Sequence, residues 1–187
     1  MQRLEETLIE NPIIAAVRNE KDLNKAINSN AEVVFVLNAN IITIKDICEK
    51  LKLSNKLVFV HIDMIEGLRA DSAGIEYIKK YAEPYGIITT KPTNVRYAKQ
   101  LGLSTIQRIF IIDSLSLDTG IRNIKEVVPD AVEVMPGVAS KIIDIIQKEV
   151  NVPIIAGGLI KNKKDVVDAL GSGAVAISTS SSDLWDI

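Results

Sequence analysis

Short aliphatic runs alternate along the chain with longer segments in which apolar residues recur at helical spacing. Eight runs are rich in Ile and Val and apolar at nearly every position: residues 12–17, 33–37, 57–62, 86–90, 106–112, 131–135, 153–156 and 174–178. Each run is too short for an independent helix, and continuous apolar strands are typical of a parallel sheet that is buried on both faces. The amphipathic segments between them, such as residues 41–52, have the spacing of helices that pack on such a sheet.

The regular recurrence of these runs predicts an α/β architecture. Successive runs begin about 23 residues apart, which accommodates a strand of about 5 residues, a helix of about 10 and two short loops. Eight consecutive strand–helix units are typical of a closed barrel, so we expect a compact (β/α)8 TIM-type barrel, with an open doubly wound sheet as the alternative. The chain has 187 residues, fewer than the roughly 250 typical of that barrel, so its helices must be short. No linker divides it, and we expect a single β/α-barrel domain over residues 1–187.

Composition narrows the class of protein. Hydrophobic residues make up 47% of the chain but aromatic residues only 4%, so the apolar side chains are mainly aliphatic, as expected for buried strands. The single cysteine, Cys48, has no partner for an internal disulfide, which favours a cytoplasmic location. The chain begins with no cationic, apolar leader and has no apolar run near the ~20 residues that span a bilayer, so we expect neither a secreted nor a membrane protein. A net charge of −2 argues against a surface that is basic throughout, although it allows a local patch for nucleic acid.

A barrel of this kind binds ligands in the loops that follow its strands. Polar residues and glycines gather at the ends of the predicted strands: Arg18 and Asn19; Asn38 and Asn40; His61, Asp63 and Glu66; Thr89, Thr90 and Lys91; Asp113 and Ser114; Glu133; Gly157 and Gly158; Thr179, Ser180 and Ser181. Because parallel strands end at the same side of a barrel, we expect these groups to form one mouth. The polar residues predicted for the ligand side of this mouth are Arg18, Asp63, Glu66, Lys91, Asp113 and Glu133.

Gly157 and Gly158 follow the seventh predicted strand, and Thr179 and Ser180 follow the eighth. In β/α barrels the loops after these two strands, with the N-terminus of a short extra helix, frequently hold a phosphate group. Glycine lets backbone N–H groups approach an anion, and hydroxyls and a helix N-terminus add donors. These four residues therefore predict a phosphate site, with a short helix in residues 181–187. The simpler interpretation is a tight turn at the glycines and helix capping by the hydroxyls.

His61, Asp63 and Glu66 form a second candidate group. His61 and Asp63 have the same parity on the third strand, so both point into the mouth if Asp63 marks the end of the strand. Glu66 lies in what the spacing predicts to be the longest loop, residues 63–71. Two carboxylates could hold Mg²⁺, act as acid and base, or accept the hydroxyl groups of a polyol. Alternatively, Asp63 orients its neighbours and His61 is a satisfied interior residue.

Lys91 precedes Pro92, which favours an extended conformation at the end of the fourth strand. Its amine could neutralise a phosphate, form a Schiff base or pair with Asp63 or Asp113. Of these uses, we expect an ion pair, either structural or at the ligand.

Polar residues also lie within two predicted strands: Gln107 and Arg108 have opposite parities on the fifth, and Glu133 lies on the sixth. An interior with polar side chains on two or three strands must be hydrogen-bonded. A basic cluster of three lysines at positions 161, 163 and 164 lies beside the predicted phosphate site, although lysines at a helix start are usually solvated. The chain has no Walker motif, no G-x-G-x-x-G and no metal-binding His pair, so we expect no metal and no cofactor.

The ordered motifs of the chain resemble those of a known family. They are PIIAAVR at 12–18, HIDMIEG at 61–67, GIITTK at 86–91, QRIFIIDS at 107–114, EVMPG at 133–137, IAGGL at 155–159, and STS at 178–180 followed by LW at 184–185. This set is similar to the glycerol uptake operon antiterminator regulatory protein family, from the first predicted strand to the C-terminus and without a large gap.

The resemblance implies a cytoplasmic regulator that responds to glycerol 3-phosphate and acts on the leader RNA of glycerol-utilisation genes, where it prevents premature termination. It assigns the phosphate to the four glycine and hydroxyl residues named above. It assigns the glycerol hydroxyls, or the ordering of the mouth, to Asp63, Glu66 and Lys91, and it implies no catalytic residue. Eight repeats leave no room for a separate RNA-binding domain, so RNA would contact the barrel's own surface or a homo-oligomer of it.

Two other functions fit the same residues. One is a small TIM-barrel enzyme that acts on a phosphorylated metabolite, with Asp63 or Glu66 as acid or base and Lys91 as an electrostatic partner. Turnover of a sugar phosphate that is lost in Asp63→Asn would support this alternative. The other is a barrel retained as a protein-interaction module with an empty site.

Overall fold

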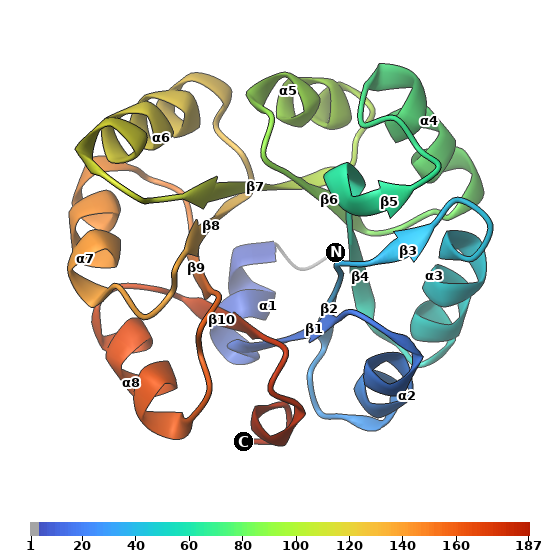
Figure 1. Cartoon of the computed structure of the whole chain (residues 1–187), viewed down its shortest axis with the longest axis horizontal. Helices are drawn as coiled ribbons and strands as arrows, with labels where there is room; N and C mark the ends of the chain where they lie inside the picture. The colour runs from blue at the N-terminus through green and yellow to red at the C-terminus, as the bar shows by residue number, and fades with distance from the viewer. Residues whose placement is uncertain (1–3) are drawn as a thin grey trace.

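Eight parallel strands close into a barrel in the computed structural model, which describes residues 4–187 (Figure 1). The strands are β1 (Ile13–Val17), β2 (Val33–Val36), β4 (Leu57–His61), β6 (Gly86–Thr89), β7 (Ser104–Phe110), β8 (Ala131–Met135), β9 (Ile154–Gly157) and β10 (Ala176–Thr179). They follow one another around the barrel in chain order, and β10 pairs with β1 to close it. Each strand overlaps one of the eight predicted runs, with bounds that differ by up to two residues, so the predicted (β/α)8 barrel is confirmed.

A ring of helices surrounds the barrel, one after each of the first seven barrel strands: α2 (Glu20–Asn28), α3 (Ile44–Leu53), α4 (Ser72–Tyr81), α5 (Pro92–Gln100), α6 (Ser114–Val127), α7 (Ser140–Glu149) and α8 (Lys163–Gly171). The eighth barrel strand is followed by a short 3₁₀ helix, η2 (Ser182–Leu184), in the segment where the sequence predicted a short helix. The ring helices have 9 to 14 residues, so they are short, as the chain length required. None of the described helices is long and apolar enough to cross a membrane.

Strand side chains alternate between the barrel interior and the helix ring, because the side-chain period of a strand is two residues. The interior cluster is aliphatic apart from Phe35 and Phe59, whose rings meet edge to face with centroids 5.9 Å apart. The outward cluster, which includes Val34, Val60 and Ile87, packs with apolar residues of the helix ring. Both faces of the sheet are therefore buried, which explains why the strands read as continuous apolar runs.

A helix that the sequence pattern did not predict, α1 (Leu4–Glu10), closes the N-terminal end of the barrel. Its Leu4 and Leu8 are buried in the same interior cluster as Ile14 and Phe35. Figure 1 shows α1 behind the strands, at the end of the barrel far from the viewer. Helices as short as these 7 residues are not stable alone, so α1 depends on the apolar barrel end against which it packs.

A small second sheet joins two loops at the opposite end of the barrel. β3 (Ala39–Asn40) pairs with β5 (Ile65–Glu66), which follows the 3₁₀ turn η1 (Ile62–Met64). The segment predicted as a long loop, residues 63–71, is therefore partly regular structure, and the loop prediction is corrected here. Strands of two residues are too short to have a hydrophobic period, so the sequence pattern could not reveal them. Their pairing holds the loops after β2 and β4 against each other at the mouth.

Gly86 in β6 tests how tightly the barrel wall is packed. A Cβ at this position would lie 2.3 Å from the Ser104 carbonyl oxygen and 2.5 Å from the Phe59 ring, so Gly86→Ala forces the wall to move. We expect this variant to lose about 1–3 kcal/mol of unfolding free energy in urea denaturation. A Cβ at Gly171, the last residue of α8, meets no atom within 4 Å, so Gly171→Ala should change stability by less than about 1 kcal/mol. Equal losses in the two variants would contradict this packing.

Candidate functional site

A cavity of about 280 Å³ opens at the carboxyl ends of β1, β8, β9 and β10. Its walls come from the strand ends and the loops that follow them: Ala16, Arg18, Leu37, Arg108, Glu133, Met135, Gly158, Leu159, Ile160, Lys161, Ser178, Thr179, Ser180 and Ser181. Half of the ten predicted site residues are among them, namely Arg18, Glu133, Gly158, Thr179 and Ser180. The structure thus brings the two predicted phosphate loops together with one basic and one acidic residue of the predicted mouth.

The floor of the cavity is a buried ion pair. Arg108 Nε donates to Glu133 Oε2 at 2.6 Å, and the two side chains are 6% and 0% exposed. The Ser178 hydroxyl donates to the other carboxylate oxygen, Oε1. Arg108 and Glu133 are paired in the register of β7 and β8, so strand pairing itself brings the charges together. Burying a carboxylate without such partners would cost several kcal/mol. The predicted hydrogen bonding is confirmed for Arg108 and Glu133, whereas the buried Gln107 Oε1 has no hydrogen-bond partner among the described residues.

Gly157 makes room for this ion pair. A Cβ on Gly157 would lie 2.4 Å from Glu133 Oε1 and 2.7 Å from Ser178 Oγ. The chain then turns through two left-handed residues, Gly158 with φ of +79° and Leu159 with φ of +64°. A leucine with positive φ is uncommon, and strained backbone of this kind concentrates at functional sites. The two glycines therefore have different roles: Gly157 leaves space for the ion pair, and Gly158 allows the turn.

Hydroxyl groups after the last strand hold the loops around the cavity. Thr179 Oγ1 donates to the Ile160 carbonyl at 2.8 Å and accepts from the Ser181 N–H at 3.1 Å. Trp185 Nε1 donates to the Thr179 carbonyl at 2.8 Å, which fixes η2 against the strand end. Because its one hydroxyl proton is committed to Ile160, Thr179 shapes the loop and does not offer that proton to a ligand.

The rim of the cavity is cationic. The Arg18 guanidinium donates to the Ser180 hydroxyl, and Lys161 is exposed in the loop after β9. Whereas Glu133 neutralises Arg108, neither Arg18 nor Lys161 forms an ion pair with a carboxylate within residues 4–187. Uncompensated cations beside a small hydroxyl-lined cavity favour an anionic ligand.

Arg108, Ser178 and Lys161 were not among the predicted site residues, although they line the cavity. The sequence placed Arg108 and Gln107 on opposite faces of one strand without deciding which of them faced the interior. A signal was present, because Arg108 is a cation on the strand next to the one that carries Glu133, and opposite charges across neighbouring strands stabilise each other.

Asp63 lies outside this cavity, on the β4 side of the mouth. Its carboxylate accepts hydrogen bonds from the Thr89 hydroxyl at 3.0 Å, the Thr90 N–H at 2.7 Å and the Thr90 hydroxyl at 3.1 Å. The residue therefore ties η1 to the end of β6, which is the orienting role that the sequence left open as an alternative.

Lys91 also lies outside the cavity. Its Nζ donates to the Ala70 carbonyl at 3.2 Å, and within the described residues it forms no ion pair. Of the two uses that the sequence favoured, the structural ion pair with Asp63 or Asp113 is not formed, and an ion pair with a ligand stays a prediction. The reason is local: Lys91 is the N-cap residue that precedes α5, and its side chain reaches the loop before α4 instead of a carboxylate.

Asp113 and Glu66 complete the predicted mouth but do not line the cavity. Asp113 is the N-cap of α6, where its carboxylate accepts from the Ser116 N–H at 2.8 Å. The hydrogen bonds from Ser116 lower the pKa of Asp113, so this side chain keeps its negative charge near neutral pH. Glu66 is exposed in β5. Among residues 4–187, no group of three or more His, Cys, Asp or Glu side chains is placed to hold a metal ion.

His61 is buried beside the polar layer, with 2% of its surface exposed. Its Nδ1 has no hydrogen-bond partner among the described residues, and the nearest carboxylate oxygen, Oδ2 of Asp63, is 4.0 Å away. The sequence left open the alternative that His61 is an interior residue with its hydrogen bonds made. For Nδ1 that alternative is wrong. Burial, followed by the positive charge of Arg108, lowers the pKa of His61 from 6.5 to about 4, so the imidazole is neutral at pH 7.

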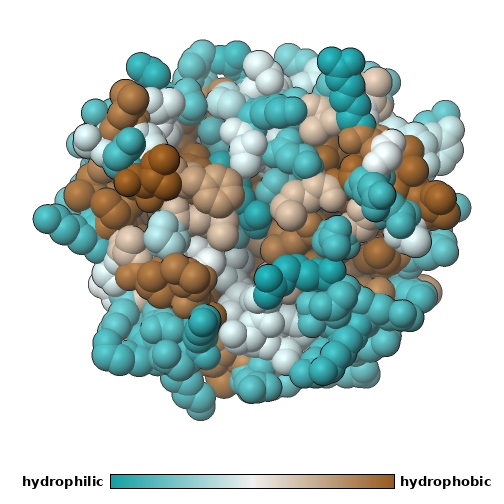
Figure 2. Space-filling model, viewed as in Figure 1, coloured by the Kyte–Doolittle hydropathy of each residue, from teal (hydrophilic) through white to brown (hydrophobic). Residues whose placement is uncertain are grey.

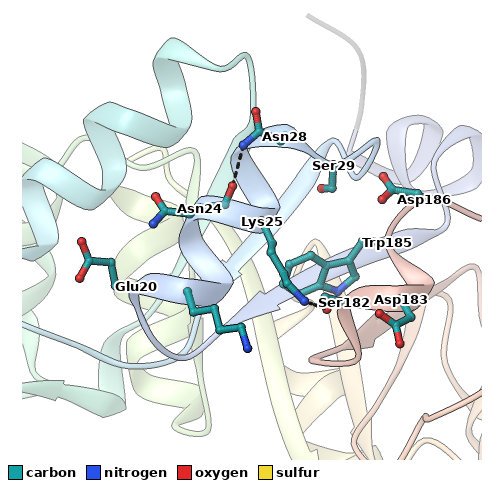
Figure 3. A pocket seen from close by; sticks show the side chains of 10 residues that line it. Glu20, Asn24, Lys25, Asn28, Ser29, Ser182, Asp183, Trp185 and Asp186 are labelled. Atoms are coloured by element: carbon teal, nitrogen blue, oxygen red, sulfur yellow. Dashed lines mark hydrogen bonds between the residues drawn. The ribbon is translucent and has the colours of Figure 1, made fainter.

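A larger hollow of about 770 Å³ lies outside the mouth, between α2 and the C-terminal segment (Figure 3). Two of its polar side chains make hydrogen bonds within it: Lys25 Nζ donates to the Ser182 hydroxyl at 2.7 Å, and Asn28 donates to the Asn24 carbonyl at 2.8 Å. The buried Trp185 forms part of its wall. This groove is where the C-terminal segment packs on α2, and it lacks the buried charged pair of the mouth, so the smaller cavity is the candidate site.

Three comparisons place the chain among known proteins. Residues 13–185 match the protein family described as "Glycerol-3-phosphate responsive antiterminator". The protein YgcP of Escherichia coli K12, described as uncharacterized, is 35% identical over 180 residues, which cover 96% of this chain and 94% of YgcP. The crystal structure of a glycerol uptake operon antiterminator regulatory protein from Listeria monocytogenes is 32% identical with a TM-score of 0.89, covering 92% of this chain and 94% of the other. That of a glycerol uptake operon antiterminator-related protein from Thermotoga maritima is 36% identical with a TM-score of 0.83, covering 94% and 98%.

His61 is the only histidine of the chain, so its titration can be followed directly. In the untagged folded protein, we expect the NMR signal of its imidazole to titrate near pH 4, against about 6.5 in urea. Because the folded pKa is the lower one, the unfolded chain binds the extra proton, and stability is lost as the pH falls from 6.5 towards 4. Over that range the wild type should lose on the order of 3 kcal/mol more unfolding free energy than His61→Gln, whose carboxylates titrate in the same way. If the unfolding free energies of the wild type and of His61→Gln fell equally over this pH range, the buried, unpaired environment assigned to His61 would be contradicted.

Proposed function

Because this chain belongs to the glycerol-3-phosphate responsive antiterminator family, we propose that it is a regulator that binds glycerol 3-phosphate in the cavity at the barrel mouth. We further propose that this ligand controls its action on the leader RNA of glycerol-utilisation genes in the cytoplasm. The observation that carries the ligand proposal is the cationic, hydroxyl-lined cavity above a fully paired polar floor.

The size and charge of the cavity support a small phosphate ester. Its volume of about 280 Å³ is just below the ~300–1,000 Å³ typical of sites for drug-sized ligands, so it suits a three-carbon ligand. In the proposed pose the phosphate lies against Arg18 and Ser180 at the rim, with Lys161 adding positive charge from the loop after β9. Gly158 itself carries no side chain at that wall, where Met135 Cε already fills the space beside it, so its backbone can approach the phosphate oxygens.

The glycerol hydroxyls then lie toward the floor. Glu133 is 0% exposed, so it acts on the ligand through the two cavity-lining side chains that it holds, Arg108 and Ser178. Gly157 and Thr179 take part indirectly, since one admits Glu133 and the other holds the loop that carries Ile160. On the far side of the mouth, Asp63, Glu66, Lys91 and Asp113 keep the remaining loops in order.

A binding role fits the acidic groups of the mouth better than acid–base catalysis does. Asp63 and Glu66, the two candidate catalytic carboxylates, are absent from the cavity wall. The oxygens of Asp63 are occupied by three hydrogen bonds from Thr89 and Thr90. Glu133 is the one acid that lines the cavity, and it is fully buried and paired with Arg108, so it is not placed to exchange a proton with a ligand.

Gly158→Ala and Gly102→Ala form a matched pair that tests the ligand site. Both glycines have left-handed backbone, with φ of +79° and +77°, so both variants lose about 1–3 kcal/mol of stability from strain. At Gly158 a Cβ would also lie 2.7 Å from Met135 Cε at the cavity wall, whereas at Gly102 it meets nothing within 4 Å. We expect millimolar glycerol 3-phosphate to raise the melting temperature of the wild type and of Gly102→Ala, with at least about tenfold weaker binding in Gly158→Ala.

Calorimetry with glycerol 3-phosphate, glycerol and inorganic phosphate then separates the two halves of the ligand. Arg18→Gln should weaken the phosphate-bearing ligands and leave any glycerol binding unchanged. A wild-type melting temperature that glycerol 3-phosphate does not move would overturn the sensor proposal, and an unaltered response in Gly158→Ala would place the site elsewhere.

Leader RNA binding should depend on the ligand. If glycerol 3-phosphate favours the RNA-binding form, the factor by which it tightens RNA binding equals the factor by which RNA tightens ligand binding. We expect fluorescence anisotropy, recorded at both about 50 and about 200 mM salt, to show RNA affinity that rises with ligand and falls with salt. Glycerol at the same concentration is the control. If RNA affinity were the same with and without glycerol 3-phosphate at both salt concentrations, the proposed coupling would be contradicted.

A further inference from the structure

Five large apolar side chains are exposed on three loops at the barrel mouth. They are Phe110 (53% exposed), Ile112 (85%) and Leu115 (73%) after β7, Val138 (43%) after β8, and Leu159 (64%) after β9. We refer to these five residues as the three-loop patch. In Figure 2, which looks onto the mouth, hydrophobic side chains gather over the side of the barrel where β7, β8, α6 and α7 lie. Large exposed apolar side chains gathered on one face are typical of an interaction site.

The patch is held rigidly, because backbone hydrogen bonds join its loops. The Ile111 N–H donates to the Met135 carbonyl at 2.8 Å, which ties the β7 loop to β8. The Gly137 N–H donates to the carbonyls of Gly157 and Gly158, the latter at 3.2 Å, which ties the β8 loop to β9. The apolar side chains are therefore presented on one preformed surface, which lowers the entropic cost of docking a partner.

The charges at the edges of the patch identify the partner. At the β7 edge Asp113 is exposed and negative, and at the β9 edge Lys161 and Lys163 are exposed and form no ion pair within residues 4–187. Val138 lies between these edges, on the middle loop. If two copies dock about a two-fold axis through the middle loop, the acidic edge of each copy faces the basic edge of the other. The same charge pairing therefore occurs at both ends of the contact.

From this arrangement we propose that the three-loop patch is a self-association face, on which a second copy of this chain docks about a two-fold axis through the loop after β8. The apolar residues form the centre of the contact and Asp113 meets Lys161 of the second copy at each end. An RNA strand suits this surface less well, because its centre is aliphatic and Asp113 would repel phosphates. The proposal goes beyond ligand sensing. Leu159 and Lys161 belong both to this face and to the cavity wall, so the test of the apolar centre uses Ile112, which does not line the cavity.

Two variants with equally exposed positions test the face. Ile112 in the patch and Leu53 at the end of α3 are both 85% exposed, so an aspartate at either position should leave the fold intact. By sedimentation velocity from about 1 to about 500 µM, we expect the wild type and Leu53→Asp to dimerise alike and Ile112→Asp to dimerise at least about tenfold more weakly. A wild type that stays monomeric over this range, or two variants that behave alike, would overturn the proposal.

The charged edges test the two-fold arrangement. Asp113→Asn removes the charge but keeps the α6 cap, because asparagine caps helices about as well as aspartate. We expect Asp113→Asn and Lys161→Gln each to weaken the dimer and to reduce its salt dependence, with Lys125→Gln, on the outer ring, as the unchanged control. Dimerisation that neither edge variant alters excludes this two-fold arrangement.

The thermal response to glycerol 3-phosphate, measured on the same variants, separates the two proposals. It should persist in Ile112→Asp, so loss of the dimer and loss of ligand sensing can be told apart. A monomeric wild type in which Ile112→Asp weakens RNA binding would assign the patch to RNA and overturn self-association.

Discussion

The mouth of this barrel depends on the buried ion pair between Arg108 and Glu133. Below it the interior is apolar, so a carboxylate at this depth is tolerated only because a guanidinium and the Ser178 hydroxyl meet both of its oxygens. The pair links β7 to β8, the serine adds β10, and Gly157 of β9 lacks a side chain so that the carboxylate fits. Four neighbouring strands are thereby held in one register at the floor of the cavity.

Because of this ion pair, the buried and the rim cations of the mouth have different roles. Because Arg108 is neutralised inside, the positive charge that can meet a ligand is on the rim, at Arg18 and Lys161. The loops that carry this charge are held in place by Thr179 and by the indole of Trp185. A rigid, paired floor and a cationic rim suit recognition of a small anion, and membership of the glycerol-3-phosphate responsive antiterminator family indicates which anion to test first.

The predicted mouth residues did not form one cluster, and the reason is geometric. The strand ends of an eight-stranded barrel form a circle, so residues after β4 and β6 lie far around the rim from those after β9 and β10. Asp63 consequently bonds to Thr89 and Thr90 on the neighbouring strand end, and Asp113 caps its own helix. Their sequence positions were correctly placed at the mouth, but residue type alone could not tell a ligand contact from a helix cap.

The sequence by itself predicted the eight strands, favoured their closure into a barrel, and placed the polar residues at one end of it, because hydrophobic period and repeat length are local properties of the chain. It also indicated the family through motifs that span residues 12–185, and the family model matches residues 13–185. Only the tertiary structure decided which side chains share the cavity, that Arg108 faces inward to meet Glu133, and that α1 and the β3–β5 pair close and brace the ends. These outcomes depend on strand register and on packing between distant segments, which no local pattern contains.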